Sequence, residues 1–80
     1  MTATLASVSL AHVGTGAAAR IVAIADEDLG ALAEVGLFEQ SLITVERRRP
    51  LGGPVLLDSG AARIAIARAV AARTRVIPER

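Results

Sequence analysis

The stretch Arg47-Arg48-Arg49-Pro50-Leu51-Gly52-Gly53-Pro54 lies between two runs of strand-forming residues, 42–47 and 54–58. Its prolines fix φ and remove a backbone donor at each end of the loop, and its glycines permit positive φ between them. The segment therefore predicts a stiff turn that joins two strands. Leu51 has no obvious core to enter, so we expect this turn to present an apolar residue, approached by three cations, to a partner.

Short apolar runs of strand type recur on both sides of this hairpin. Val8 and Leu10 recur at period two, and Ile64 and Ile66 do the same later in the chain. The predicted strands are residues 6–13, 18–25, 42–47, 54–58, 62–67 and 75–78, with a single helical turn at 70–73. Short strands separated by close turns are typical of a small barrel, whose closure removes exposed edges.

One segment has helical instead of strand periodicity. We expect Asp26 to cap a helix over about residues 27–35, where negative charge in the first turn is favourable. Gly36 follows as a left-handed stop, and Leu37 would then contact Leu32 as in a Schellman ending. The sequence thus predicts a mainly β fold of five to six short strands, with one short α-helix between strands 2 and 3.

Length and composition limit the architecture. The 80 residues are enough for one domain, 1–80, but too few for two separate cores. Hydrophobic residues make up 52% of the chain and aromatics only 1%, so the core must consist of Val, Ile, Leu and Ala. The absence of cysteine excludes a disulfide framework, a thiolate zinc site and an iron–sulfur cluster.

Net charge and hydropathy indicate the cellular location of the protein and the kinds of partner it can bind. A net charge of +1 argues against a dedicated nucleic-acid binder, because such proteins must neutralise several phosphates. The most apolar stretch, 17–25, is short and contains Arg20, so no membrane insertion is expected. Residues 1–10 lack the pattern of a secretory signal. We therefore expect a cytoplasmic protein.

Catalytic and metal-binding patterns are weak. His12 is the only histidine, and a lone imidazole is a poor basis for a transition-metal site. The acidic residues 26–28 are explained by their position at a helix start. Gly14-Thr15-Gly16 lacks the following Lys-Ser/Thr of a phosphate-binding loop. Ser7, Ser41 and Ser59 have no neighbouring histidine. We expect neither an enzyme, nor a cofactor, nor a metal site.

The order of these features resembles the FeoA family, ferrous iron transport protein A, and the related C-terminal domain of some metal-dependent repressors. The residues that carry the resemblance are Arg20-Ile21, Gly36-Leu37, Val45, Pro50-Leu51-Gly52-Gly53-Pro54, Gly60, Ile64-Ala65-Ile66-Ala67-Arg68 and Val76. The resemblance covers almost the whole chain. It implies an SH3-like barrel and a small cytosolic non-enzyme that supports the ferrous iron transporter FeoB.

The chain departs from the family pattern at two places. Glu39-Gln40 stand where the family has a Pro-Gly turn, and neither residue adopts positive φ at low cost. That turn is therefore expected to be differently shaped or strained. Thr74 stands where an isoleucine is usual, which would leave a polar group near the closing seam. The two departures indicate a divergent member.

The candidate partner-binding residues are Leu37, Arg47, Arg49, Leu51, Gly52 and Gly53. If the helix end and the loop tip lie on one side, they would form an apolar patch with an arginine rim. Phe38 either joins that patch or fills the barrel, which we favour. Because strand side chains alternate, Arg48 should point away from Arg47 and Arg49. Simple solvation of the arginines is the equally weighted alternative.

Three interpretations of function remain open. The first is docking of the hairpin and helix end on the cytoplasmic part of FeoB. The second is a detached regulatory domain, related to the C-terminal domain of metal-dependent repressors, that binds a repressor core or nucleic acid. The third is self-association through the same apolar surface.

Overall fold

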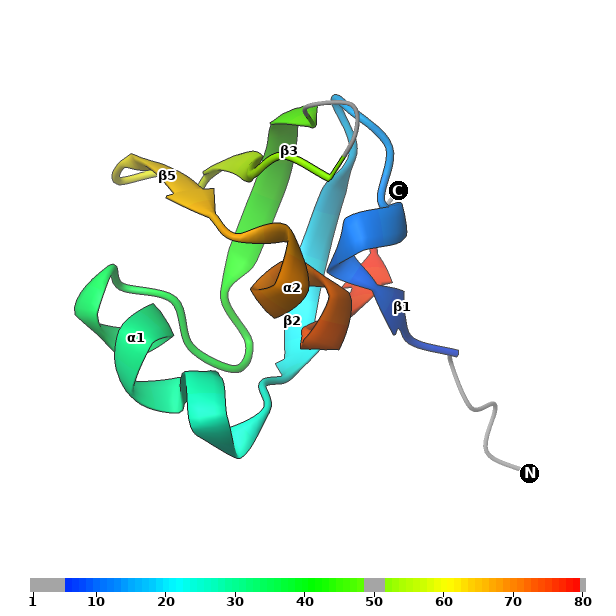
Figure 1. Cartoon of the computed structure of the whole chain (residues 1–80). Helices are drawn as coiled ribbons and strands as arrows, with labels where there is room; N and C mark the ends of the chain where they lie inside the picture. The colour runs from blue at the N-terminus through cyan, green and yellow to red at the C-terminus, as the bar shows by residue number, and fades with distance from the viewer. Residues whose placement is uncertain (1–5, 49–51, 80) are drawn as a thin grey trace.

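The computed structural model describes residues 6–48 and 52–79, and its six strands form one antiparallel sheet (Figure 1). The strands are β1 (Val8–Ser9), β2 (Ala18–Ala23), β3 (Leu42–Arg48), β4 (Val55–Asp58), β5 (Arg63–Ile66) and β6 (Arg75–Pro78). Their order in the sheet is β1-β6-β2-β3-β4-β5. The fold is mainly β and SH3-like, as predicted.

The sheet is not closed, which corrects the expectation of a barrel without edges. β1 and β5 are its two edge strands. β1 is short because the chain turns into the 3₁₀ helix η1 (Leu10–His12), where the Ser9 hydroxyl accepts a hydrogen bond from Ala11 N. Helix α2 (Arg68–Arg73) lies against η1 and β1. The predicted helical turn at 70–73 is therefore confirmed and extends two residues earlier.

The core is aliphatic, as the composition requires. Its largest fully buried side chains are Leu10, Ile21, Leu37, Ile43, Leu57, Val45, Val55, Val76 and Thr74. Alternation along the strands produces this core, since Ile43 and Val45 of β3 are buried while the residues between them are not. Thr74 is the polar group expected near the seam, and its hydroxyl donates to Val70 O at 2.8 Å.

The predicted helix consists of two pieces, the 3₁₀ helix η2 (Asp26–Asp28) and helix α1 (Leu29–Glu34). No side chain caps either piece, so the expected cap by Asp26 is wrong. The expected Schellman ending is confirmed. Gly36 has φ of 83°, its N–H bonds to Ala33 O at 3.0 Å, and Leu37 N–H bonds to Leu32 O at 2.8 Å.

The turn at Glu39-Gln40 is strained, as the missing Pro-Gly pair predicts. Gln40 has φ of 79°, and it is the one non-glycine residue with positive φ in the described part of the chain. Its N–H donates to Ile21 O at 2.7 Å, and its carbonyl accepts from Arg20 Nη1 at 2.8 Å. These bonds hold the unfavourable backbone conformation in place against the middle of β2.

Candidate functional site

The β3–β4 hairpin places Arg47 and Arg48 on opposite faces, and a shift in register decides which face each residue takes. Val45 pairs with Leu57, but Arg47 pairs with Leu56 and Arg48 with Val55. The extra residue reverses the alternation, so Arg47 shares the outer face with Leu56 while Arg48 shares the inner face with Val55. The predicted separation of Arg47 from Arg48 is confirmed, because the two adjacent residues alternate as expected after the shift.

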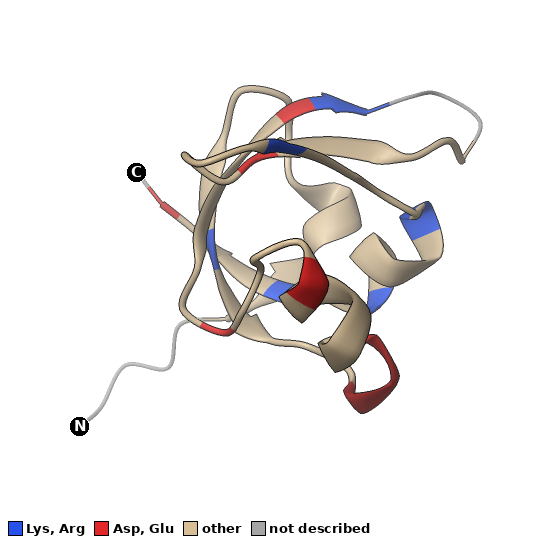
Figure 2. Cartoon of the chain, turned by 90° about the vertical axis from the view of Figure 1, so that its left-hand side faces the viewer, with Lys and Arg blue, Asp and Glu red and all other residues tan. Residues whose placement is uncertain are grey.

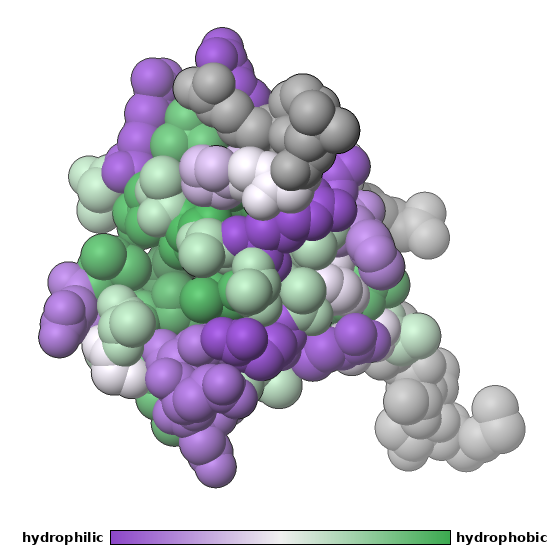
Figure 3. All heavy atoms as spheres, in the orientation of Figure 1, coloured by the Kyte–Doolittle hydropathy of each residue, from purple (hydrophilic) through white to green (hydrophobic). Residues whose placement is uncertain are grey.

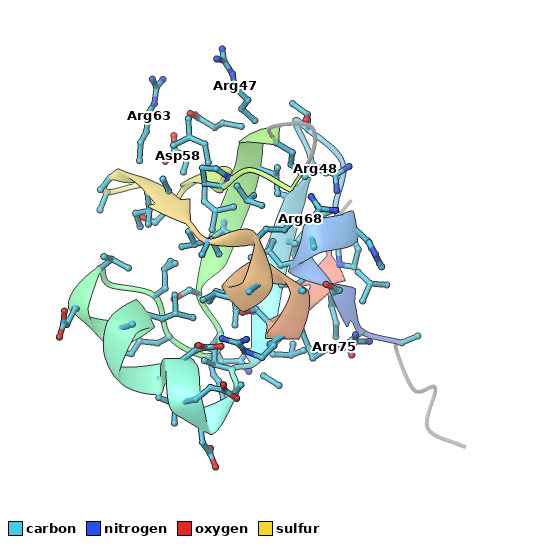
Figure 4. The ribbon with its side chains drawn as sticks, in the orientation of Figure 1. Arg47, Arg48, Asp58, Arg63, Arg68 and Arg75 are labelled. Atoms are coloured by element: carbon cyan, nitrogen blue, oxygen red, sulfur yellow. The ribbon has the colours of Figure 1, made fainter. Side chains whose placement is uncertain are left out.

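Arg48 is engaged in a hydrogen bond within the domain and does not present its charge freely to solvent. Its guanidinium Nη1 donates to the carbonyl of Ala11, at the end of β1–η1. Figure 4 shows Arg48 directed toward this part of the molecule, whereas Arg47 and Arg63 extend away from the sheet. Arg63 pairs with Glu46 at 3.1 Å. Arg47 is thus the exposed cation of the hairpin among the residues described here.

The loop itself is described from Gly52 onward. Gly52 has φ of 81°, which confirms the expected positive φ, and a Cβ there would lie 3.7 Å from Cδ of Arg68. Gly53 is half-buried and leads into β4. The predicted partner-binding residues Arg49 and Leu51 lie outside the described residues.

The helix end differs from expectation. Leu37 is only 1% exposed and belongs to the core, so the prediction of an exposed Leu37 is wrong. Phe38 is 55% exposed, so the favoured placement of this aromatic inside the barrel is also wrong. The Schellman ending explains the exchange, because Leu37 is turned inward after Gly36 and Phe38 follows it outward.

The hairpin and the helix end do not form one patch. The segment from Phe38 leads into the start of β3, and the hairpin arginines lie at the other end of this seven-residue strand. Seven strand residues span about 23 Å. Figure 1 shows α1 toward the bottom of the molecule and the hairpin end of β3 at its top. The two surfaces must therefore act separately.

A second surface was not predicted. An apolar groove of about 190 Å³ runs between α1, the edge strand β5 and the start of α2. Figure 3 shows hydrophobic residues gathered around a hollow in this region. The groove is lined by Ala31, Leu32, Val35, Ile64, Ala65, Ile66, Ala67 and Val70. Sequence periodicity gave Leu32, Ile64 and Ile66 as core residues, but it gave no indication that β5 would remain at a free edge.

One ion pair positions the helices around this groove. Asp28, at the start of α1, accepts hydrogen bonds from Arg73 Nε at 3.0 Å and Nη2 at 2.8 Å. The hydrogen bonds from Arg73 lower the pKa of Asp28; burial opposes this shift, and the Arg73 charge adds to it. Asp28 raises the pKa of Arg73 for the same reasons. Both groups are therefore charged at neutral pH.

Metal and membrane features are limited. In residues 6–48 and 52–79, no three His, Asp or Glu side chains gather to hold a metal ion. His12 is exposed. No helix within the same ranges is both long and apolar enough to cross a bilayer.

A profile of the FeoA domain matches residues 8–78. The chain belongs to the FeoA domain family. This is a family of small non-catalytic domains. A search of curated proteins finds no match.

Solved structures agree with the family assignment. A crystal structure of an iron uptake regulatory protein (FeoA) is 29% identical, with a TM-score of 0.82 over 94% of this chain and 100% of that one. The FeoA protein from Chlorobium tepidum is 22% identical, with a TM-score of 0.78 over 86% of this chain and 68% of that one.

The fold also occurs within a larger regulator. A manganese-dependent transcriptional repressor is 20% identical, with a TM-score of 0.87 over 99% of this chain and 45% of that one. The FeoA-like fold is therefore shared between iron uptake proteins and metal-dependent repressors.

Proposed function

We propose that this FeoA-family protein is a non-enzymatic interaction module that supports ferrous iron uptake by docking on the cytoplasmic part of FeoB. The observation that carries the proposal is the β3–β4 hairpin, which projects Arg47 from a scaffold in which most other arginines are engaged. Of the seven described arginines, five have a hydrogen-bond or ion-pair partner within the domain: Arg20, Arg48, Arg63, Arg73 and Arg75.

The described end of β3 is tied to the rest of the domain, which suits the hairpin to docking. Arg48 donates to Ala11 O, and a Cβ at Gly52 would lie 3.7 Å from Cδ of Arg68. A surface that is ordered before binding loses less conformational entropy on association. We propose that Arg47, Arg49, Leu51, Gly52 and Gly53 form the contact, with Leu51 as its apolar point. Leu37 is removed from this set because it is buried.

A pull-down with the cytoplasmic domain of FeoB tests the proposal. Leu51→Asp and Arg47→Glu should each reduce recovery severalfold relative to the unaltered chain, because a charge replaces the apolar point or reverses the exposed cation. The matched control is Leu42→Asp. Leu42 is 47% exposed at the opposite end of β3, so its replacement should leave recovery unchanged. Equal recovery of all three variants would remove the hairpin from the interaction.

The second candidate is a regulatory domain that acts with a repressor core or with nucleic acid. This candidate is supported by structural similarity to a manganese-dependent transcriptional repressor, 45% of whose chain is covered by the same fold. The arginine pairing weighs against nucleic acid, because five of the seven described guanidiniums already have a partner within the domain. A mobility assay at two salt concentrations distinguishes the candidates, since phosphate-driven binding weakens steeply with salt.

A further inference from the structure

The free edge of β5 has backbone groups that the sheet does not use. Ser59 N donates to Ala62 O at 3.0 Å, so this pair is hydrogen-bonded, and the β4–β5 register continues from it. Hydrogen-bonded and non-hydrogen-bonded pairs alternate along an antiparallel ladder. Ile64 and Ile66 therefore form the hydrogen-bonded pairs with Leu57 and Val55 of β4. The N–H and C=O of Arg63 and Ala65 therefore point outward, away from the sheet.

This edge forms one wall of the apolar groove. Ala65 is exposed, and the residues from Ile64 to Ala67 all line the groove. The opposite wall is α1, where Val35 is 44% exposed. An extended segment laid along β5 would thus complete backbone hydrogen bonds on one side and place alternate side chains against α1 and α2 on the other.

Charges at the ends of β5 restrict what the segment can be. Arg63 begins the strand and Arg68 follows it at the start of α2. The two basic residues thus flank β5. Figure 2 shows basic and acidic segments interspersed along the ribbon on this side of the molecule. Arg63 is already paired with Glu46 but remains largely exposed, with 73% of its side chain accessible.

A second copy of the chain fits this edge poorly. Antiparallel pairing of two β5 strands about Ala65 would place Arg63 of one copy opposite Ala67 of the other, one residue from Arg68. Like charges would then gather at both ends of the contact, which is unfavourable. The edge suits a foreign strand with an apolar centre and acidic ends.

We propose that β5 and the adjoining groove bind an extended peptide segment by strand addition, with carboxylates of the segment facing Arg63 and Arg68. This surface adjoins the hairpin at Arg68, whose side chain lies near Gly52, and it does not require FeoB as the partner. The bound segment adds a seventh strand to the sheet next to β5.

Fluorescence anisotropy with the full chain tests the proposal. The probe is a labelled peptide with blocked ends, Asp-Val-Thr-Val-Thr-Val-Asp. We expect saturable binding that weakens about tenfold when alternate amides of the probe are N-methylated, because each methyl group removes a backbone donor. Replacement of both Asp residues by Lys should weaken binding similarly. No detectable binding at 1 mM protein, or equal binding of the N-methylated probe, would overturn strand addition.

Two protein variants locate the site. Ala65→Pro removes an outward N–H without breaking a bond to β4, and Val35→Asp places a charge in the groove from an exposed position. Each should weaken probe binding about tenfold. Leu42→Asp, at the opposite end of β3 from the hairpin and outside the groove, should not. Full binding by Val35→Asp would exclude the groove.

Sedimentation resolves the alternative occupant. If the unaltered chain forms a dimer that Ala65→Pro abolishes, the edge is occupied by a second copy and the peptide proposal is wrong. A monomer at all concentrations, together with probe binding, supports it. FeoB recovery by Ala65→Pro is measured in parallel, so that failure of this proposal is distinguished from failure of hairpin docking.

Discussion

Asp28 and Arg73 form a bidentate ion pair, with N···O distances of 3.0 and 2.8 Å, across 45 residues of sequence. The pair joins the turn before α1 to the end of α2. Glu27 lies at the outer side of the same guanidinium, 3.8 Å from Nε. Bidentate geometry holds both partners in one orientation, so the pair fixes how the helices stand around the apolar groove.

Loss of this pair should destabilise the protein in a pH-dependent way. The bond to Arg73 depresses the pKa of Asp28 in the folded state, so its stabilising effect is present at neutral pH and disappears as pH falls through that depressed value. Asp28→Asn should therefore lower the thermal unfolding midpoint at pH 7. The difference from the unaltered chain should narrow below about pH 4, as calorimetry over a pH series would show.

The matched control for this prediction is Asp26→Asn. Asp26 lies in the same turn but is exposed, and the described residues give it no ion-pair partner. Its replacement should shift the midpoint little at any pH. A difference between Asp28→Asn and the unaltered chain that stays constant down to pH 2 would contradict the linkage.

Truncation of Leu37 and of Phe38 to alanine should lower the free energy of unfolding by very different amounts, because one side chain is buried and the other is exposed. Leu37→Ala removes a fully buried side chain from a tightly packed core, and such changes cost about 2–5 kcal/mol. Phe38→Ala should change the free energy of unfolding by less than about 1 kcal/mol, because the ring is more than half exposed. Urea denaturation of the two variants checks both values. A larger loss for Phe38→Ala than for Leu37→Ala would contradict the structure.

The strand runs and the Schellman ending were predictable because they rest on local rules of alternation and backbone conformation. The positions of Leu37 and Phe38 were not. Both are apolar and adjacent, and only the direction in which the chain leaves Gly36 decides which of them enters the core. The shift in register at Arg47 was hidden for a similar reason, since one extra residue in β3 reverses every later side chain.

The groove and the ion pair depend on contacts between distant segments. Asp28 looked like a helix-start residue, and nothing near it in sequence indicates Arg73. The free edge of β5 likewise follows from the strand order, in which β1 and β5 remain apart. Composition and periodicity indicate most of the residues that are buried. They do not determine whether the two end strands meet.

Thr74 should contribute through its shape as much as through its hydroxyl. Its side chain is fully buried, and Val70 O, which accepts its hydroxyl, also accepts the Thr74 N–H at 3.1 Å. Thr74→Val keeps the volume and leaves that carbonyl with a partner, so the cost should be below about 1 kcal/mol. Thr74→Ser keeps the hydroxyl but loses a methyl group, at about 0.8 kcal/mol or more. Denaturant titration should give Thr74→Val a free energy of unfolding at least as high as that of Thr74→Ser.

Replacement of Gln40 by glycine should stabilise the fold. Gln40 is held at φ of 79°, and left-handed backbone costs a residue with a Cβ about 1–2 kcal/mol relative to glycine. Glycine loses more chain entropy on folding, which offsets part of this gain. The net expectation for Gln40→Gly is an increase of about 0.5–1 kcal/mol in the free energy of unfolding, measured by urea titration.

The neighbouring position supplies the control for Gln40→Gly. Glu39 is exposed and does not have positive φ, so Glu39→Gly relieves no strain and should destabilise the protein slightly through entropy alone. Opposite signs for adjacent substitutions of the same kind would show that the backbone conformation at Gln40 stores energy. If Gln40→Gly is no more stable than Glu39→Gly, the bonds that Gln40 makes to Ile21 and Arg20 have removed the strain instead of holding it.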